Sequence, residues 1–449
     1  MLLRFGLSNY LSIGDYQELS FAASKLQDNA SHLMHIENQS IGTADYLPVV
    51  ALYGANAAGK SNFLIGLSAC CQAVKKSYGN AKSFGDDLDR RKFVGYRPCF
   101  ATHDGGKNDS HFDIDFLMDG VRYHYGFEVG KAGYVREWLY AYPKKARQII
   151  FIRDFGAEGD PFDPGPAIRT KLDPTLRSLA ADQSFLFLSA AGSLNNAVLA
   201  PIAQYFSERV VFLHNVEEAN ELAIADQIRD DRVKQFVIKF LEAADSGIVD
   251  IEVAETPRSE KQKQVVAGVL GAIGKALKEL DPDAPELPLN NREVDYSIQF
   301  VHEGPDGRKF KLGMGMESSG TLHLLSILAP VLSALEKGHA LIIDEITTSL
   351  HTMVSQELIK LFSDSSINKA NAQFVFSTHD TNLLSSDMLR RDEIWFTEKD
   401  GDGSTHLYPL TDFKTRKGDN IEKGYLQGRF GAIPYFGDVA ALLGHVGRD

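Results

Sequence analysis

The stretch that decides the fold is Val49-Val50-Ala51-Leu52-Tyr53-Gly54-Ala55-Asn56-Ala57-Ala58-Gly59-Lys60-Ser61. It matches the phosphate-loop pattern G-x-x-x-x-G-K-[ST]. The apolar run before the first glycine predicts a buried strand, and the apolar residues over Ser61–Val74 recur at helical spacing. A strand, a glycine-rich loop and a helix in this order form the context that the pattern requires.

The loop has the residue types that hold a polyphosphate. Glycines let the backbone wrap around the phosphates, so that N–H groups and a helix N-terminus point at negative oxygens. We predict ATP contacts from Gly54, Ala55, Asn56, Ala57, Ala58, Gly59, Lys60, Ser61 and Asn62. Lys60 would reach the β- and γ-phosphates, and the Ser61 hydroxyl would ligate Mg²⁺. The alternative is an ordinary Gly/Ala-rich turn.

The composition is that of a soluble globular protein. The chain has 449 residues, enough for two or three domains, with 44% apolar and 24% charged residues. No apolar run approaches transmembrane length and no signal peptide is evident, so we expect a cytoplasmic protein without a membrane partner. Three cysteines without a CxxC pair indicate neither zinc nor disulfides. The net charge of −13 argues against a generally basic nucleic-acid binder but leaves a local basic groove open.

The rest of the chain predicts an α/β fold with a mixed central sheet. Alternating residues over Leu2–Phe21 predict a hairpin, and 111–153 predicts an antiparallel β-insertion with a tight turn at Asp119-Gly120. Residues 79–92 are expected to form a loop, and 281–288 a linker. We divide the chain into an ATPase lobe (1–214), a mostly helical insertion arm (215–292) and a second ATPase lobe (293–449).

A second motif ends in two carboxylates. His339–Glu345 is an apolar run followed by Asp344 and Glu345, which predicts a buried parallel strand. Asp344 would hold Mg²⁺ beside Ser61, and Glu345 would orient and deprotonate the attacking water. The alternative is a plain acidic strand cap.

Two further motifs complete the pattern. Phe374–Asp380 is another apolar strand, and it places His379 where a γ-phosphate could be hydrogen-bonded. Ser318, Ser319 and Gly320 precede an apolar helix, where hydroxyls, free N–H groups and the helix dipole favour an anion. Since this would be a second anion site, it suits the nucleotide of another subunit. The alternative for His379 is a structural histidine, and the alternative for Ser318–Gly320 is an ordinary N-cap.

Together these motifs resemble the ABC-type ATPase head of the SMC/RecF group. More closely they resemble the AAA-type ATP-binding proteins of bacterial abortive infection and anti-phage defence, similar to the ATPase subunit of PARIS-type systems and the ATPase part of overcoming-lysogenisation proteins. The resemblance extends to three further segments: Trp138–Pro143, Phe185–Ser189 and Tyr425–Pro434. It implies that two heads enclose ATP, with Ser318 and Gly320 reaching the γ-phosphate across the dimer and Ser349–His351 crossing the interface.

The chain also departs from the family pattern. The signature turn reads Glu-Ser-Ser-Gly-Thr instead of Leu-Ser-Gly-Gly-Gln, and His351 stands where aspartate is usual. Gln183 is the candidate for the glutamine-bearing loop. These departures suggest slow or triggered turnover, which suits a sensor better than a motor.

The last seventy residues indicate no nuclease in the same chain. Their acidic residues belong to a predicted solvated turn instead of a metal cluster: Asp387, Asp392, Asp400 and Asp402. The resemblance therefore implies a homo-oligomer with a separately encoded effector, such as a Toprim-like, RloB-like or HNH nuclease, and a phage protein as trigger. A basic tail is the candidate dock for the effector or a nucleic acid, or a solvated surface: Lys414, Arg416, Lys417, Lys423 and Arg429.

Three other functions compete with this sensor. A DNA-repair ATPase that clamps DNA on ATP binding would show a basic groove and DNA-stimulated hydrolysis. A transporter ATPase would carry a membrane-docking surface and the Leu-Ser-Gly-Gly-Gln signature, which this chain lacks. A scaffold with vestigial hydrolysis conflicts with the presence of Glu345.

Overall fold

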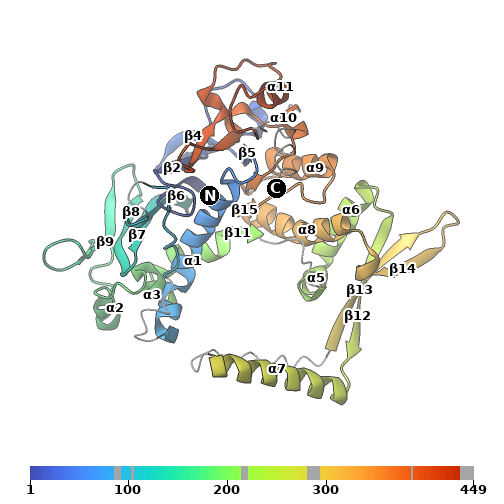
Figure 1. The fold of residues 1–449 in the computed structure, drawn as a ribbon, viewed down its shortest axis with the longest axis horizontal. Coiled ribbons are helices and arrows are strands. Elements are labelled where there is room, and N and C mark those ends of the chain that lie inside the picture. The colour runs from blue at the N-terminus through green and yellow to red at the C-terminus, as the bar shows by residue number, and fades with distance from the viewer. Residues whose placement is uncertain (85–92, 103–105, 214–220, 281–293, 386–387, 435–449) are drawn as a thin grey trace, which may run out of the picture. The chain divides into compact units, whose positions relative to one another are not determined.

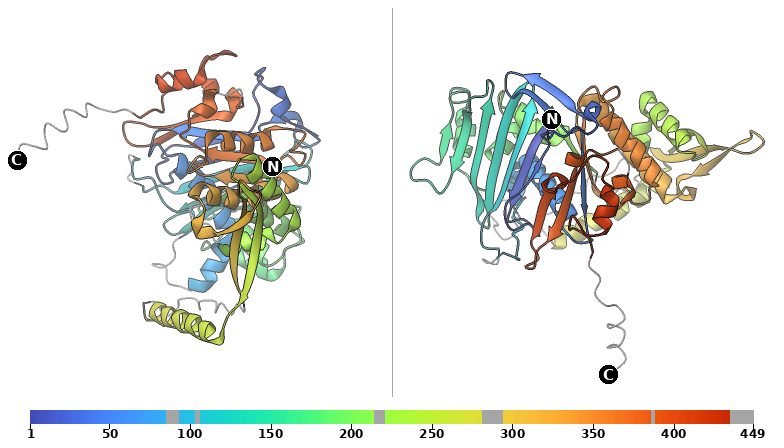
Figure 2. Two further views of the ribbon diagram at one scale, coloured as in Figure 1. Left: turned by 90° about the vertical axis from the view of Figure 1, so that its right-hand side faces the viewer. Right: turned by 90° about the horizontal axis from the view of Figure 1, so that it is seen from above.

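The computed structural model describes residues 1–84, 93–102, 106–213, 221–280, 294–385 and 388–434. The chain forms two compact units, one made of 1–214 and 334–449 and the other of 215–333 (Figures 1 and 2). Parts of the predicted loop (85–92) and the whole predicted linker (281–288) lie outside the described residues. The division into three segments remains a prediction.

The first unit contains a six-stranded sheet. Its order is β11 (Val210–Leu213), β15 (Ala340–Ile343), β16 (Gln373–Ser377), β5 (Val49–Gly54), β17 (Ile394–Lys399) and β18 (Thr405–Pro409). The first five are parallel, and β18 pairs with β17 in the antiparallel direction. Every residue of β5, β15 and β16 is buried, as expected for central parallel strands. The sheet is therefore mixed, and the predicted apolar strands are confirmed.

A seven-stranded antiparallel sheet forms the other layer of this unit. Its order is β10 (Phe162–Pro164), β9 (Gln148–Asp154), β8 (Gly133–Tyr142), β7 (Val121–Gly130), β6 (Ser110–Met118), β1 (Leu2–Ser8) and β2 (Gln17–Ser20), and β6 to β9 lie side by side in Figure 2. Asp119 and Gly120 have φ of 50° and 78°, the left-handed values that a tight hairpin needs. Both predicted hairpins are confirmed. A separate pair joins β3 (Met34–Asn38) and β4 (Gly42–Tyr46).

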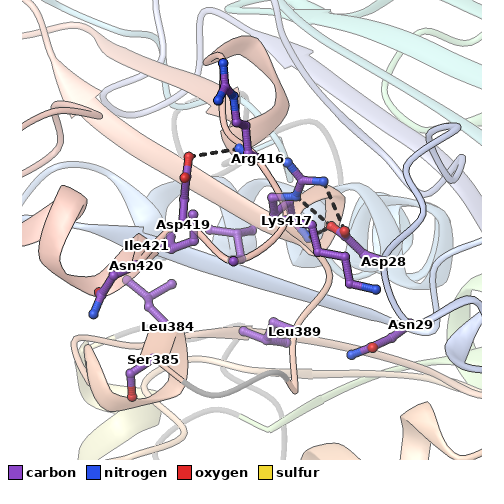
Figure 3. Close-up of a pocket in the computed structure, with 13 residues that line it drawn as sticks. Asp28, Asn29, Leu384, Ser385, Leu389, Arg416, Lys417, Asp419, Asn420 and Ile421 are labelled. Atoms are coloured by element: carbon purple, nitrogen blue, oxygen red, sulfur yellow. Dashed lines mark hydrogen bonds and ion pairs between the residues drawn. The ribbon is translucent and has the colours of Figure 1, made fainter.

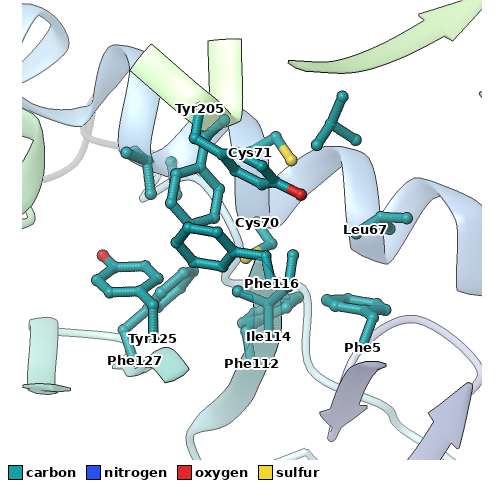
Figure 4. Packing of buried hydrophobic residues seen from close by; sticks show 14 of the residues in the cluster. Phe5, Leu67, Cys70, Cys71, Phe112, Ile114, Phe116, Tyr125, Phe127 and Tyr205 are labelled. Carbon is teal, nitrogen blue, oxygen red and sulfur yellow. The ribbon is translucent and has the colours of Figure 1, made fainter. Parts of the chain in front are cut away.

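The core of the first unit lies between α1 (Lys60–Phe84) and the antiparallel sheet (Figure 4). Leu67 and Cys70 on α1 are buried among the aromatic residues of β1 and β6, where the ring of Phe116 stacks on Tyr205 at 4.2 Å. The three cysteines are free and buried, so they act as small core residues. The helix runs through Gly79, so the prediction of a loop from that residue is wrong for 79–84. One helical glycine costs too little to end a helix that is packed on one face.

Shorter helices complete the unit. They are α2 (Pro174–Leu179), α3 (Phe187–Ser193), α4 (Ala200–Gln204), α9 (Thr352–Ser363), α10 (Asn382–Ser385) and α11 (Ile421–Leu426). Helix α2 ends at Leu179, and α3 begins at Phe187. The Glu137 carboxylate accepts hydrogen bonds from the N–H groups of Phe187 and Leu188 and thereby starts α3.

The second unit combines helices with a three-stranded antiparallel sheet. Its elements are α5 (Glu221–Ile228), α6 (Asp231–Ala243), β12 (Ile248–Pro257), α7 (Glu260–Leu280), β13 (Val294–Glu303), β14 (Lys309–Gly313) and α8 (Ser319–Lys337), which continues into the first unit. Helices α5 and α6 are separate, because Asp230 caps α6 by accepting from Arg232 N at 2.9 Å. Among the described helices, α8 alone has the length and apolar composition of a membrane span, and half of that window is buried.

Candidate functional site

Three loops meet at one edge of the parallel sheet. β15, β16 and β5 are neighbours and run in the same direction, so their carboxyl ends lie at the same edge. The phosphate-loop sequence follows β5, Asp344 and Glu345 follow β15, and His379 follows β16. This edge is where open α/β sheets place their ligands.

The loop after β5 is held against the β17–β18 hairpin. Gly59 has a φ of 109°, and a Cβ there would lie 2.2 Å from the Thr405 hydroxyl oxygen. A Cβ on Gly54 would lie 2.5 Å from the carbonyl oxygen of Thr397. Glycine is therefore required at both positions by close packing. Ala57, with a φ of 62°, is a non-glycine residue in the left-handed region, which is uncommon outside tight turns.

Lys60 lies inside this loop. Its side chain is buried, with 4% of the residue exposed, and Nζ donates to the carbonyl oxygens of Gly54 at 3.1 Å and Ala55 at 3.3 Å. Burial lowers the pKa of Lys60, and the nearby carboxylates of Glu345 and Asp344 oppose that shift. A desolvated ammonium at the centre of a glycine loop is suited to an anionic ligand.

His379 connects the lysine to the acidic pair. Its Nε2 lies 2.9 Å from Lys60 Nζ and 3.2 Å from Glu345 Oε1. Burial and then the Lys60 charge lower the pKa of His379, so the ring is neutral at pH 7 and Nε2 can accept from the lysine. The His379 and Glu345 side chains are 40% and 34% exposed, so both are open to a ligand or to water.

Ser377 holds the Asp344 carboxylate and the backbone of Glu345. Its hydroxyl donates to Asp344 Oδ1 at 2.5 Å and accepts from the backbone N–H of Glu345 at 2.8 Å. Glu345 has a φ of 57°, a backbone conformation that costs energy outside glycine and often occurs at functional sites. Sequence reasoning missed Ser377, although its place beside His379 at the strand end could have indicated it.

A chain of hydroxyl and amide groups lies beside the start of α1. Asn62 Nδ2 donates to Ser12 Oγ at 2.7 Å, Ser12 Oγ lies 2.7 Å from Thr405 Oγ1, and Thr405 Oγ1 donates to Ala58 O at 3.0 Å. The loop and Asn62 are thus tied to the turn after β1 and to β18. Ser61, the predicted metal ligand, is half-buried in the first turn of α1.

The other predicted residues make local contacts. In the second unit, Ser318 Oγ accepts from Thr321 N at 3.0 Å as the N-cap of α8, and Ser318 and Ser319 are exposed. His351 caps α9, accepting from Met353 N at 3.2 Å. Gln183 lies beside β8, where its carbonyl oxygen accepts from Tyr134 N at 2.8 Å.

The donor set fits a magnesium nucleotide. A hydroxyl (Ser61) and a carboxylate (Asp344) are hard oxygen ligands, and Mg²⁺ commonly takes few protein ligands beside water and phosphate oxygens. Within the described ranges, no group of three or more His, Cys, Asp or Glu is arranged to hold a metal ion. The described residues therefore do not form a site in which protein groups alone surround a metal ion.

A polar pocket of about 260 Å³ lies elsewhere in the first unit (Figure 3). The bidentate ion pair between Asp28 and Arg391, with Nε to Oδ2 at 2.7 Å, forms part of its wall. Arg416 and Lys417 of the basic tail also line it. None of its lining residues belongs to the strand-end group around Lys60.

The chain was compared with solved structures and with protein families. Solved structures similar to this chain include the SMC head domain from Thermotoga maritima, with 12% identity and TM-score 0.40 over 91% of this chain and 98% of that one. An Smc head domain with an extended coiled coil from Pyrococcus furiosus has 13% identity and TM-score 0.40 over 95% and 99%. The recombination mediator protein RecF has 14% identity and TM-score 0.34 over 91% and 98%.

At the level of sequence, no curated protein matches the chain. The family model described as "AAA domain, putative AbiEii toxin, Type IV TA system" matches residues 49–385, which include both the phosphate loop and the His379 strand end. That span is more than half of the 449 residues, so the chain belongs to this family of AAA-domain proteins.

Proposed function

We propose that the protein binds and hydrolyses Mg²⁺-ATP at the strand-end site, and that two copies enclose the nucleotide. One observation carries the proposal: Lys60, His379 and Glu345, far apart in sequence, lie in a row with atom separations of 2.9 and 3.2 Å. A phosphate-binding cation, a neutral histidine and a carboxylate at one sheet edge are the groups that phosphoryl transfer to water needs.

Each residue has a defined task in this proposal. Lys60 and the loop N–H groups bind the β- and γ-phosphates, while Ser61 and Asp344 hold Mg²⁺, which would neutralise developing charge when bound. Glu345 orients the attacking water and takes its proton. His379 donates or accepts a hydrogen bond at the γ-phosphate. Ser377 holds the Asp344 carboxylate and the Glu345 backbone by the two hydrogen bonds described above.

Self-assembly follows from the signature turn. Ser318, Ser319 and Gly320 lie at the N-terminus of a 19-residue helix, and the two serines are exposed. Hydroxyls, N–H groups and the positive dipole end favour an anion there. In the proposed assembly this turn of one copy contacts the γ-phosphate bound by the loop of another.

The biological role we propose is that of a sensor that controls a separately encoded effector in anti-phage defence. The family's description as a putative toxin of a toxin–antitoxin system supports such a role. The effector is a nuclease of Toprim-like or other type, the trigger a phage protein, and the compartment the cytoplasm. Exposed Arg416 and Lys417 beside the polar pocket are the candidate dock.

The deciding experiment measures ATP hydrolysis and solution mass with and without Mg²⁺-ATP for the wild type, Lys60→Ala and Glu345→Gln. Glu345→Gln should lose turnover and accumulate an ATP-bound assembly, whereas Lys60→Ala should neither bind nor assemble. His35→Ala removes the exposed contact between His35 and Asp45 on the β3–β4 hairpin and should behave as wild type. Wild-type turnover in Glu345→Gln would refute the assignment of the base.

The same assay separates the sensor from a DNA clamp. Hydrolysis is measured with and without double-stranded DNA at two salt concentrations, because phosphate contacts weaken steeply with salt. A sensor should show turnover that DNA leaves unchanged. DNA-stimulated, salt-sensitive turnover would favour the repair ATPase instead.

A further inference from the structure

A partly buried polar contact joins the signature turn to the three-stranded sheet. His302 Nε2 lies 2.7 Å from Glu317 Oε1, and the two side chains are only 14% and 7% exposed. Glu317 directly precedes Ser318, the N-cap of α8. A polar pair at this depth is held in one geometry by the residues around it, unlike a surface pair.

The sheet holds the His302 ring on two sides. His302 is on β13 opposite Phe310 of β14, and the rings stack with centroids 5.4 Å apart and planes inclined by 16°. On another side the chain passes closely at Gly247, where a Cβ would lie 3.7 Å from His302 Nδ1. The imidazole therefore has little freedom to leave Glu317.

Glu317 is fixed at its backbone too. Its N–H donates to Met314 O at 3.2 Å, which closes the short turn before the helix. A carboxylate at this place is attracted by the positive end of α8, where it would compete with an anionic ligand for the same N–H groups. The hydrogen bond from His302 holds that carboxylate in a buried position beside the sheet instead.

We propose that His302 is a positioning residue for the signature turn, and that the β12–β14 sheet controls through it whether Ser318 and the helix N-terminus can receive the γ-phosphate. This inference rests on the proposed composite ATP site. It makes the sheet a regulatory element: a partner that displaces the β13–β14 hairpin would release Glu317 and switch assembly off. His302 itself touches no nucleotide.

The test uses the full chain in the Glu345→Gln background, in which ATP-bound assemblies should accumulate. Adding His302→Ala should raise the ATP concentration for half-maximal assembly by roughly tenfold or more, as expected for a lost hydrogen bond to a charged group. ATP binding to the isolated copy, measured with a fluorescent ATP analogue, should not change. Adding His302→Gln, whose amide can donate from the place of Nε2, should restore most of the assembly.

The matched control is His35→Ala in the same background. His35 Nδ1 also lies 2.7 Å from a carboxylate, that of Asp45, but the pair is exposed and far from the turn in sequence. Adding Glu317→Ala to His302→Ala should restore most of the assembly, because it removes the released carboxylate that competes for the N–H groups of the helix N-terminus. Unchanged assembly in His302→Ala, or failure of His302→Gln to restore it, overturns the inference.

The outcomes separate this inference from the proposed function. If Glu345→Gln alone does not assemble with ATP, the composite site fails and His302 is irrelevant to it. If Glu345→Gln assembles and His302→Ala assembles equally well, only the positioning role fails. Thermal unfolding without nucleotide shows whether His302→Ala is folded, and His302→Gln supplies the answer if it is not.

Discussion

Nζ of Lys60 lies 2.9 Å from Nε2 of His379, although the two residues are 319 positions apart in the chain. This contact joins the phosphate loop to the end of β16. It is possible only with a neutral imidazole, since two positive groups at this separation would repel each other.

The first prediction concerns the titration of His379. Burial and the Lys60 charge lower the pKa of His379, while Glu345 and Asp344 raise it. Lys60→Met should therefore raise the pKa of His379 toward the ordinary histidine value. Glu345→Gln should lower the pKa of His379 further. The measurement is a pH titration of the His379 ring resonance by NMR, assigned with His379→Gln. A midpoint that does not move in Lys60→Met would show that the contact is absent in solution.

The second prediction compares two glycines of one strand–loop–helix segment. Gly59→Ala places a Cβ against Thr405 at a φ of 109°, so it should cost about 1–3 kcal/mol of unfolding free energy and abolish ATP binding. Gly79→Ala, on the exposed side of α1 with no atom within 4 Å, should stabilise by about 0.5–1 kcal/mol and leave ATP binding intact. Urea unfolding and nucleotide titration test both. Equal stability of the two variants would contradict the packing described for the loop.

Local patterns predicted much of this site because each motif is short. Val49–Lys60 contains the strand, the turn and the lysine, and the apolar runs before Asp344 and His379 indicate buried parallel strands. Strands of this kind end at one edge of a sheet, so their functional ends meet. The motifs did not predict the order in which these strands lie in the sheet.

The supporting contacts were not predictable, because their partners are distant in the chain. Thr405 approaches Gly59 only because β18 folds back along β17, and Ser12 reaches Asn62 only because the N-terminal hairpin joins the antiparallel sheet. The same holds for α3, whose start depends on Glu137 from another strand. The helix and strand propensities of single residues carry no information on such tertiary contacts.

The third prediction is a pH dependence of stability from Glu393. Burial raises the pKa of this carboxyl from 4.5 to about 8, and within the described residues its Oε1 has no hydrogen-bond partner. The folded state therefore holds the proton more tightly than the unfolded state. Its contribution is complete below about pH 4.5 and is lost as the pH rises to about 8, with a slope of at most about 1.4 kcal/mol per pH unit.

Glu393→Gln removes that dependence. The wild type loses stability from pH 5 to pH 8 and the variant does not, so the difference in unfolding free energy should grow in favour of the variant. Urea midpoints measured at each pH give this difference. Glu357→Gln, at an exposed site of α9, serves as the control and should follow the wild type. A constant difference between Glu393→Gln and wild type across this range would show that Glu393 is ionised in the folded protein.

The fourth prediction concerns the buried pair Arg153–Glu137. The two side chains are fully buried, 2.9 Å apart, and Glu137 also accepts from Tyr125 and from the first N–H groups of α3. Arg153→Met leaves that carboxylate buried without its cation, so it should cost about 3–5 kcal/mol of unfolding free energy.

Arg136→Met is the matched control for this pair. Arg136 lies 3.5 Å from Asp154, and both side chains are exposed, so its loss should cost less than about 1 kcal/mol. Urea unfolding of both variants gives the comparison. Since Arg153 also donates to the carbonyl oxygens of Asp182 and Phe185, its removal should also loosen the segment before α3, seen as faster amide exchange there. Equal costs for the two variants would mean that the buried carboxylate takes up a proton once its partner is gone.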